Sequence, residues 1–354
     1  MDIAKRIARY HRFYESRRPG DLLIAVRNGW VTKKNLFDYD FDRGGHLEMA
    51  ADTVEGARTL GARNAGLDDD MIPWVGPDFG IAIHHAHLFE GLPVRMAEWT
   101  SWAPHPLTGP DGLNRGRIDE IRFNPGNRWV RMIVEMLHYW VEHNDGSYLT
   151  IGHGHFSPLD LANAIRGNDI FLDYYDNPEE LSLLMDRCTD AIAEFEELQR
   201  TAIAKQLAEI GTPFWGALGP KNAAYISEDV MDMSGPAISA QWGLPWSRRL
   251  RERLGTLMIH HHAMGLHVQR VIAQEMSDSL IQVSNDPNYP PTMDTFEQIY
   301  ADSGDNAIML DASPADIVKN IGRLKHVRAI LMTGGEKKDV QKAIDAVRSV
   351  SNIA

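Results

Sequence analysis

The last third of the chain alternates between short apolar runs and amphipathic segments, and this alternation constrains the fold more than any other feature. The apolar runs are typical of buried strands and are Leu280–Val283, Ala307–Leu310 and Ala329–Met332. The segments that follow them have helical spacing and are Met293–Ser303, Pro314–Leu324 and Lys338–Val350. Repeated strand–helix units indicate a parallel sheet with right-handed crossovers. We therefore expect an α/β fold, with a (β/α)8 TIM-type barrel as the leading architecture and an open doubly wound sheet as the alternative.

The earlier part of the chain follows the same pattern less regularly. Further strands are predicted at Leu22–Val26, Tyr148–Ile151, Thr212–Trp215 and Leu257–Ile259, and longer helices at Arg128–His143 and Asn177–Ile210. Residues 37–115 are rich in Gly, Pro, Trp and His, which predicts loops over the C-terminal face with short helices such as Asp52–Leu60. Because no repeat or linker interrupts the chain, we expect one domain over residues 1–354, irregular over 1–120 and regular over 145–350.

Composition excludes several classes of function. The net charge of −13 argues against a nucleic-acid-binding surface, and no apolar run approaches the length of a membrane span. The first 18 residues carry many charges and lack the apolar core of a signal peptide. Cys188 is the only cysteine, so a disulfide within the chain and a zinc site with several thiolates are both excluded. These features favour a cytoplasmic protein without nucleic-acid or membrane partners.

Three consecutive histidines, His260, His261 and His262, end the apolar run Leu257–Ile259 and precede a segment with helical spacing. Such a strand end lies at the mouth of a parallel sheet, where α/β enzymes place their reactive groups. Strand alternation puts His260 and His262 on one side and His261 on the other, toward the helix layer. Neutral imidazole is a good zinc ligand, so the first pair is a candidate metal and catalytic site.

Carboxylates that would complete a metal shell follow neighbouring strands. Asp286, just after Leu280–Val283, is the first choice, and Glu228 and Asp229 come next. The same carboxylates would alternatively orient a histidine by a hydrogen bond. The competing interpretation is that His260 and His262 are hydrogen-bonded pocket residues without a metal.

Candidate substrate-binding residues stand at other strand ends and in the irregular segment. His153 and His155 flank Gly154 after a predicted strand, so alternation places both on one side. The remaining candidates offer indole, hydroxyl or backbone N–H groups and are Tyr225, Trp99, Trp102, Gly334 and Gly335. The motif His84-His85-x-His87 has the composition of a metal site, but structural histidines are the favoured interpretation.

Four segments occur in a characteristic order over residues 145–350. They are Ser157–Asn168 with Asp176–Glu180, Tyr225–Pro236, His262-Ala263-Met264-Gly265, and Leu331–Gly335 before a final helix. In this order and spacing they resemble the uroporphyrinogen decarboxylase superfamily, which also contains corrinoid-linked methyltransferases. The third segment resembles that family's His-x-Cys-Gly turn, with Met264 in place of the cysteine. The resemblance implies a (β/α)8 barrel with its active cleft at the C-terminal ends of the strands.

The resemblance also implies an activity. We expect an enzyme that moves a methyl group between a small methylated substrate, such as an O-methyl compound, and the cobalt of a corrinoid carried by a partner protein. Zinc or a protonated imidazole would stabilise the charge that develops on the leaving atom. The residues expected in these roles are His262, His260, Asp286 and Glu228. Because relatives with this fold are often dimers, a homodimer is expected as well.

Two other functions stay open at this point. The first is a cofactor-independent decarboxylase of a carboxylated ring compound, whose carboxylates would be held by Arg17, Arg18 or Arg27. The second is a non-catalytic ligand-binding barrel.

Overall fold

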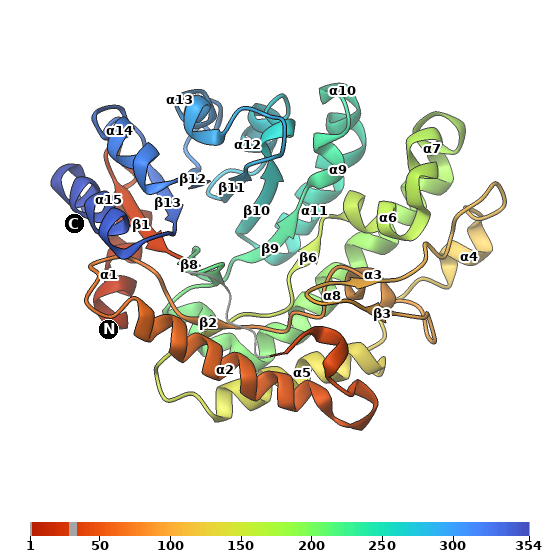
Figure 1. Ribbon diagram of the computed structural model, residues 1–354. Helices are drawn as coiled ribbons and strands as arrows, with labels where there is room; N and C mark the ends of the chain where they lie inside the picture. The colour runs from red at the N-terminus through yellow and green to blue at the C-terminus, as the bar shows by residue number, and fades with distance from the viewer. Residues whose placement is uncertain (1, 28–33, 354) are drawn as a thin grey trace.

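The computed structural model describes residues 2–27 and 34–353, and it is an α/β protein built on a seven-stranded parallel sheet (Figure 1). The order of the strands is β1-β13-β12-β11-β10-β9-β6, and every neighbouring pair is parallel. The strands are β1 (Leu22–Val26), β6 (His155–Phe156), β9 (Ala224–Ser227), β10 (Leu257–His262), β11 (Leu280–Ser284), β12 (Ala307–Asp311) and β13 (Ala329–Thr333). The α/β expectation is confirmed, and all three strands predicted in the last third are present.

Six short strands form separate pairs. β2 (Trp74–Val75) is parallel to β5 (Leu149–Thr150), whereas β3 (Arg95–Met96) with β4 (Ser101–Trp102) and β7 (Pro213–Phe214) with β8 (Ala217–Leu218) are antiparallel. The strand predicted at Thr212–Trp215 therefore belongs to a hairpin and not to the main sheet. The chain turns back there because Trp215 and Gly216 both have positive φ, 47° and 92°.

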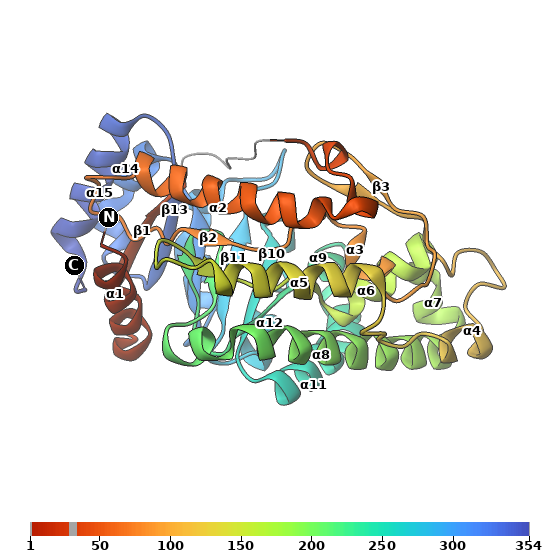
Figure 2. The same ribbon diagram turned by 90° about the horizontal axis from the view of Figure 1, so that it is seen from below.

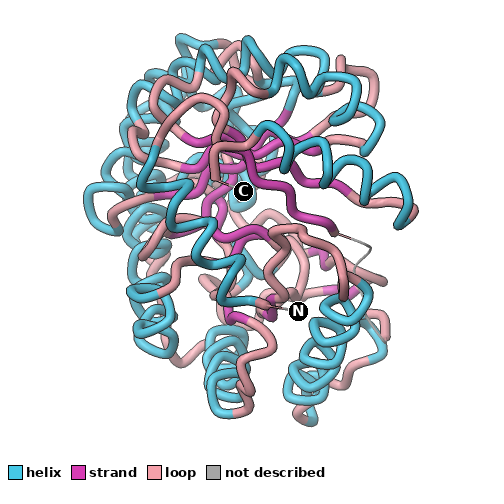
Figure 3. The backbone as a smooth tube through the Cα atoms, turned by 90° about the vertical axis from the view of Figure 1, so that its left-hand side faces the viewer, coloured by secondary structure: helices cyan, strands magenta, loops and turns pink. Residues whose placement is uncertain are grey.

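Helices surround the strands, as the tube in Figure 3 shows. The longer ones are α1 (Ile3–Ser16), α2 (Gly45–Arg63), α5 (Arg128–Glu142), α6 (Pro158–Arg166), α8 (Pro178–Glu209), α11 (Leu244–Leu254), α13 (Thr292–Asp302), α14 (Pro314–Leu324) and α15 (Lys337–Val350). The short ones are α3 (Ile83–Ala86), α4 (Arg115–Asp119), α7 (Ile170–Asp176), α9 (Asp229–Asp232), α10 (Pro236–Ile238) and α12 (Gln269–Glu275). Each central strand is buried on both faces, which is why the strands of the last third consist mostly of apolar residues.

Two N-terminal helices differ from expectation. Helix α1 was not predicted, because arginines occupy part of its buried face; Arg6 and Arg9 lie inside the protein as ion pairs with Asp69 and Asp70. Helix α2 was predicted only as the short segment Asp52–Leu60, yet it runs for 19 residues. In Figure 2, α2 lies alongside α5, and α5 lies alongside α8. No helix in the described part of the chain combines the length and apolar character that crossing a membrane requires.

Candidate metal centre

Strand β10 presents its three histidines as alternation requires. The Nε2 atoms of His260 and His262 lie 3.2 Å apart on one side of the strand. His261 points to the other side, where it is fully buried against α9 and α12. The predicted division of the three side chains is thus confirmed.

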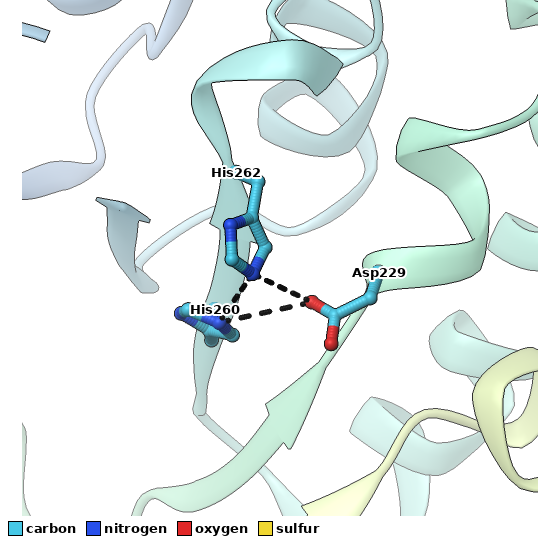
Figure 4. Close-up of side chains that lie close together, drawn as sticks. All are labelled: Asp229, His260 and His262. Atoms are coloured by element: carbon cyan, nitrogen blue, oxygen red, sulfur yellow. Dashed lines mark hydrogen bonds and ion pairs between the residues drawn. The ribbon is translucent and has the colours of Figure 1, made fainter. Parts of the chain in front are cut away.

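Asp229 joins the histidine pair from the turn after β9 (Figure 4). Its Oδ1 lies 3.7 Å from Nε2 of His260 and 3.6 Å from Nε2 of His262. The point equidistant from the three ligand atoms is about 2.0 Å from each, which is the usual length of a zinc bond to imidazole or carboxylate. Oδ1 of Asp229 is buried and accepts no hydrogen bond within the described structure. A cation at that point would satisfy it.

Gln282 fixes the orientation of His260. The amide nitrogen of Gln282 donates to Ser284 Oγ at 2.9 Å, so its Oε1 is left to accept a hydrogen bond from Nδ1 of His260. The proton is therefore on Nδ1, and the lone pair of Nε2 points toward Asp229 and His262. Burial lowers the pKa of His260 to about 4, so the ring stays neutral and able to bind a metal at physiological pH.

Asp286 fixes the orientation of His262 in the same way. Its Oδ1 accepts a hydrogen bond from Nδ1 of His262 at 2.8 Å, and its Oδ2 accepts one from the backbone N–H of Met264 at 2.8 Å. A carboxylate behind a ligating histidine holds the ring in place and makes its free nitrogen a stronger ligand. Of the two roles weighed for Asp286, the contacts match the orienting one.

A second carboxylate, Asp232, supports the end of β10 from behind. Its Oδ2 accepts the backbone N–H of His262 at 2.6 Å, and its Oδ1 lies 3.3 Å from Nδ1 of His261. The other nitrogen of His261 faces Oε1 of Gln269. Burial by itself lowers the pKa of His261, but the hydrogen bond and charge of Asp232 outweigh it, so this pKa is raised. A Cβ at position 265 would lie 1.5 Å from Asp232 Oδ1, which explains the glycine there.

Glu228 lies outside the group, contrary to its assignment as a metal ligand. Its side chain is buried on the helix side, and its Oε1 accepts a hydrogen bond from Ser247 Oγ at 2.5 Å. The strand pairing explains the difference. His260 pairs with Ser227, so a side chain on the same face of the sheet as His260 must come from a residue an even number of positions from Ser227. Asp229, two residues beyond Ser227, meets this condition, whereas Glu228, one residue beyond it, faces the other side.

Four of the seven predicted substrate-binding residues line one of two cavities, and the other three do not. His153, Tyr225 and Trp99 line a cavity of about 360 Å³. Gly334 lines another, of about 440 Å³, together with Arg27. His155 is buried beside Glu196 and lines neither cavity. Trp102 and Gly335 are also absent from the lining of both cavities.

The motif His84-His85-x-His87 forms part of the packing. His84 stacks on Phe156 with ring centres 4.1 Å apart, and Nδ1 of His87 donates to the carbonyl of Ile83 at 2.9 Å. Burial lowers the pKa of His84, and that of His87 to about 3. Across residues 2–27 and 34–353, the group of Asp229, His260 and His262 is the one place where three such ligand atoms converge.

The metal group is open on one side. The side chains of His262 and Asp229 are 31% and 42% exposed, so a water or substrate atom has access to a fourth position. Two imidazoles, one carboxylate and an open position are the ligand set of catalytic zinc sites. Comparison with known family models and with curated proteins finds no match to this chain. The chemistry must accordingly be argued from the site.

Proposed function

We propose that this protein transfers a methyl group between a small methylated substrate, such as an O-methyl compound, and a corrinoid carried by a partner protein, with zinc at Asp229, His260 and His262. The observation that carries the proposal is the triangle of ligand atoms, with sides of 3.2, 3.6 and 3.7 Å. When bound, the metal supplies a Lewis acid that stabilises negative charge on the oxygen or sulfur that loses the methyl group. The resemblance to the uroporphyrinogen decarboxylase superfamily supports the choice of methyl transfer.

The chain's own residues have defined tasks in this scheme. Gln282 and Asp286 hold the two imidazoles with their Nε2 lone pairs converging, so both lone pairs already face the position that a metal would occupy. The exposed edges of His262 and Asp229 leave room for the substrate atom to approach. We place the activity in the cytoplasm, consistent with the single cysteine, Cys188, which is buried and free.

We further propose that the sheet closes into a (β/α)8 barrel. β5 and β6 are separated by only four residues, and they pair with β2 on one side and β9 on the other. Just before β2, the backbone N–H of Asp70 donates to the carbonyl of Ile24 in β1 at 2.7 Å. In the proposed barrel, residues 70–75 would be an eighth segment between β1 and residues 149–156, and these contacts support that arrangement.

The positions of Arg17, Arg18 and Arg27, all within the described residues, do not favour the decarboxylase alternative. Arg17 and Arg18 precede β1 and therefore lie at the opposite end of the sheet from His262, and Arg17 pairs with Asp278 at the surface. Only Arg27, which follows β1, is at the same end as the metal group. A single guanidinium is a weak basis for holding a ring with several carboxylates.

The experiment has two stages. Elemental mass spectrometry on tag-free protein, prepared without chelator, should find about one zinc ion per chain in the wild type and less than about a tenth of that in Asp229→Asn and His262→Ala. The second stage supplies free cob(I)alamin and a methyl ether such as 2-methoxyphenol, and follows formation of methylcobalamin. His138→Ala, at an exposed position on α5, is the matched control.

The outcomes separate methyl transfer from the ligand-binding alternative. Zinc-dependent methyl transfer that is lost in both ligand variants supports the proposal. Full transfer by His262→Ala, or by protein stripped of metal, would overturn it. Bound zinc with no transfer from any ether or thioether would point to the ligand-binding alternative.

A further inference from the structure

An aromatic cavity lies beside the metal group. Its volume is about 360 Å³, and Trp99, one of the residues that line it, is 78% exposed. Five aromatic rings from four separate segments line it: Trp74, Trp99, Phe214, Trp215 and Tyr225. So many large rings around one small space give a surface rich in π-electron density.

The cavity carries no positive charge. Among the described residues that line it there is no lysine or arginine, and Asp78 is the one carboxylate. The two histidines in the wall, His84 and His153, are neutral, because burial lowers the pKa of both, that of His153 to about 4. Any charge selection in this cavity therefore favours cations.

Trp215 connects the cavity to the metal group. It occupies the first position of a two-residue hairpin loop with φ of 47°, where asparagine or glycine is the usual residue. Its ring stacks on Phe214 with centres 4.9 Å apart and meets the ring of His260 edge-on at 5.1 Å. A bulky residue in this conformation costs about 1 kcal/mol or more, and such strain is concentrated at functional sites.

We propose that this cavity binds a quaternary or N-methylated ammonium group of the substrate, held by the aromatic rings and Asp78. A cation beside aromatic faces is attracted by the ring quadrupole, and a carboxylate adds a direct ion pair. The ammonium group is the part that positions the molecule, while the reacting oxygen or sulfur lies beyond Trp215 toward His260. Only this last placement rests on the proposed function.

Charge distinguishes an ammonium group from a neutral aromatic ring, which the same walls would also accommodate. A neutral ring would remove water from Asp78 without replacing its interaction, at a cost in binding free energy. An ammonium group would pair with Asp78 instead. A divalent ion at the metal group is offset by Asp229 and Asp286, and the chain as a whole carries a net charge of −13, so neither would repel a cation.

The test compares choline with 3,3-dimethyl-1-butanol, in which an uncharged carbon replaces the ammonium nitrogen at almost the same shape. Isothermal titration calorimetry on the full chain should show choline binding at least about tenfold more tightly. Trp215→Ala should weaken choline binding by about tenfold or more, and Asp78→Asn by several-fold. Trp102→Ala is the matched control, because that indole is 57% exposed and does not line the cavity. If Trp215→Ala fails to fold, Trp99→Ala tests the same wall at a solvent-exposed position.

Equal affinity for the two alcohols, tighter binding of benzyl alcohol than of choline, or no binding of choline would overturn the proposal. So would a Trp102→Ala loss as large as that of Trp99→Ala. The titration is repeated on Asp229→Asn, which we expect to lose metal and keep choline binding. Failure of the cavity proposal and failure of the metal-dependent methyl transfer are thus read from different measurements.

Discussion

Two groups of histidines occur in this protein, and only one has the surroundings of a metal site. His260 and His262 each have one nitrogen held by a neighbouring side chain, and their other nitrogens converge on Asp229. In the second group, which comprises His84, His87 and His153, two of the three rings bond backbone carbonyls, and all three pack against other rings.

The difference lies in the partners and not in the number of histidines. In the first group a carboxylate is present to offset the charge of a metal, and hydrogen bonds orient each imidazole. A buried ring that bonds a carbonyl and stacks on phenylalanine stays neutral and serves as packing. In this chain the histidine pair of β10 has the surroundings of a metal site because a strand end brings Asp229 to the same face.

Substitution of the metal-ligating side chains tests the difference between the two histidine groups most directly. Asp229→Asn and His262→Ala should lower zinc affinity by more than about a hundredfold, since each leaves two protein ligands. His84→Ala, in the second group, should leave zinc affinity unchanged within about threefold, because it lies outside the ligand triangle. Competition with a fluorescent zinc chelator measures all three. A loss of affinity in His84→Ala comparable to that in His262→Ala would show that the two groups are not distinct.

Removal of the charge behind His262 should have the next largest effect. Asp286→Asn keeps the shape of the side chain but weakens the orienting bond, and we expect zinc affinity to fall by about 10- to 100-fold. The same chelator competition applies. Asp345→Asn, at an exposed position on α15, is the control for loss of one negative charge. Equal affinities in Asp286→Asn and the wild type would remove Asp286 from the site.

A smaller effect on zinc affinity is expected from a substitution that displaces Asp232, which supports the end of β10. Gly265→Ala places a methyl group against Asp232, which must move and release the N–H of His262, so zinc affinity should fall by about tenfold. Gly322→Ala on α14 is the matched control, since a Cβ there meets no atom within 4 Å. Unchanged affinity in Gly265→Ala would show that Asp232 does not position the ligand.

Substitutions in the second group should change the stability of the fold and leave metal binding unchanged. The pKa of His87 is lowered to about 3 by burial, so the folded chain stays unprotonated there while the unfolded chain takes up a proton below about pH 6.5. The stabilising contribution is complete above pH 6.5 and is lost as the pH falls toward 3. We compare the free energy of unfolding, measured with urea, at pH 7 and pH 4.5. Its decrease between the two pH values should be about 2 kcal/mol smaller in His87→Phe than in the wild type.

His138→Gln, at an exposed position on α5, should keep the full loss of stability between the two pH values. If His87→Phe shows the same pH dependence as the wild type, then His87 is protonated in the fold. Its role as neutral packing would then be incorrect.

Prediction from the sequence succeeded where a local rule is strong. The alternation of β10 separated His260 and His262 from His261, and the apolar periodicity located α14 at its observed bounds, Pro314–Leu324. It failed where a long-range contact overrides local pattern. Helix α1 buries Arg6, which composition alone assigns to the surface, because Asp69 lies opposite it.

The third metal ligand shows the same limit. Asp286, Glu228 and Asp229 all follow buried strands, and the sequence ranked Asp286 first. That ranking was wrong, because the choice of ligand depends on which residue of β9 pairs with His260. That register places Asp229 beside His262 and turns Glu228 toward Ser247. Asp286 acts from the far side of the His262 ring.

The sequence by itself determined the parallel α/β architecture, the strand end that carries the histidines, and the side of β10 that each one faces. These follow from periods of two and 3.6 residues, which are properties of the local backbone. The tertiary structure decided which carboxylate completes the metal group and that Trp215 packs against His260. Such choices depend on strand register and on contacts between segments far apart in the chain, and no local pattern encodes the distances between those segments.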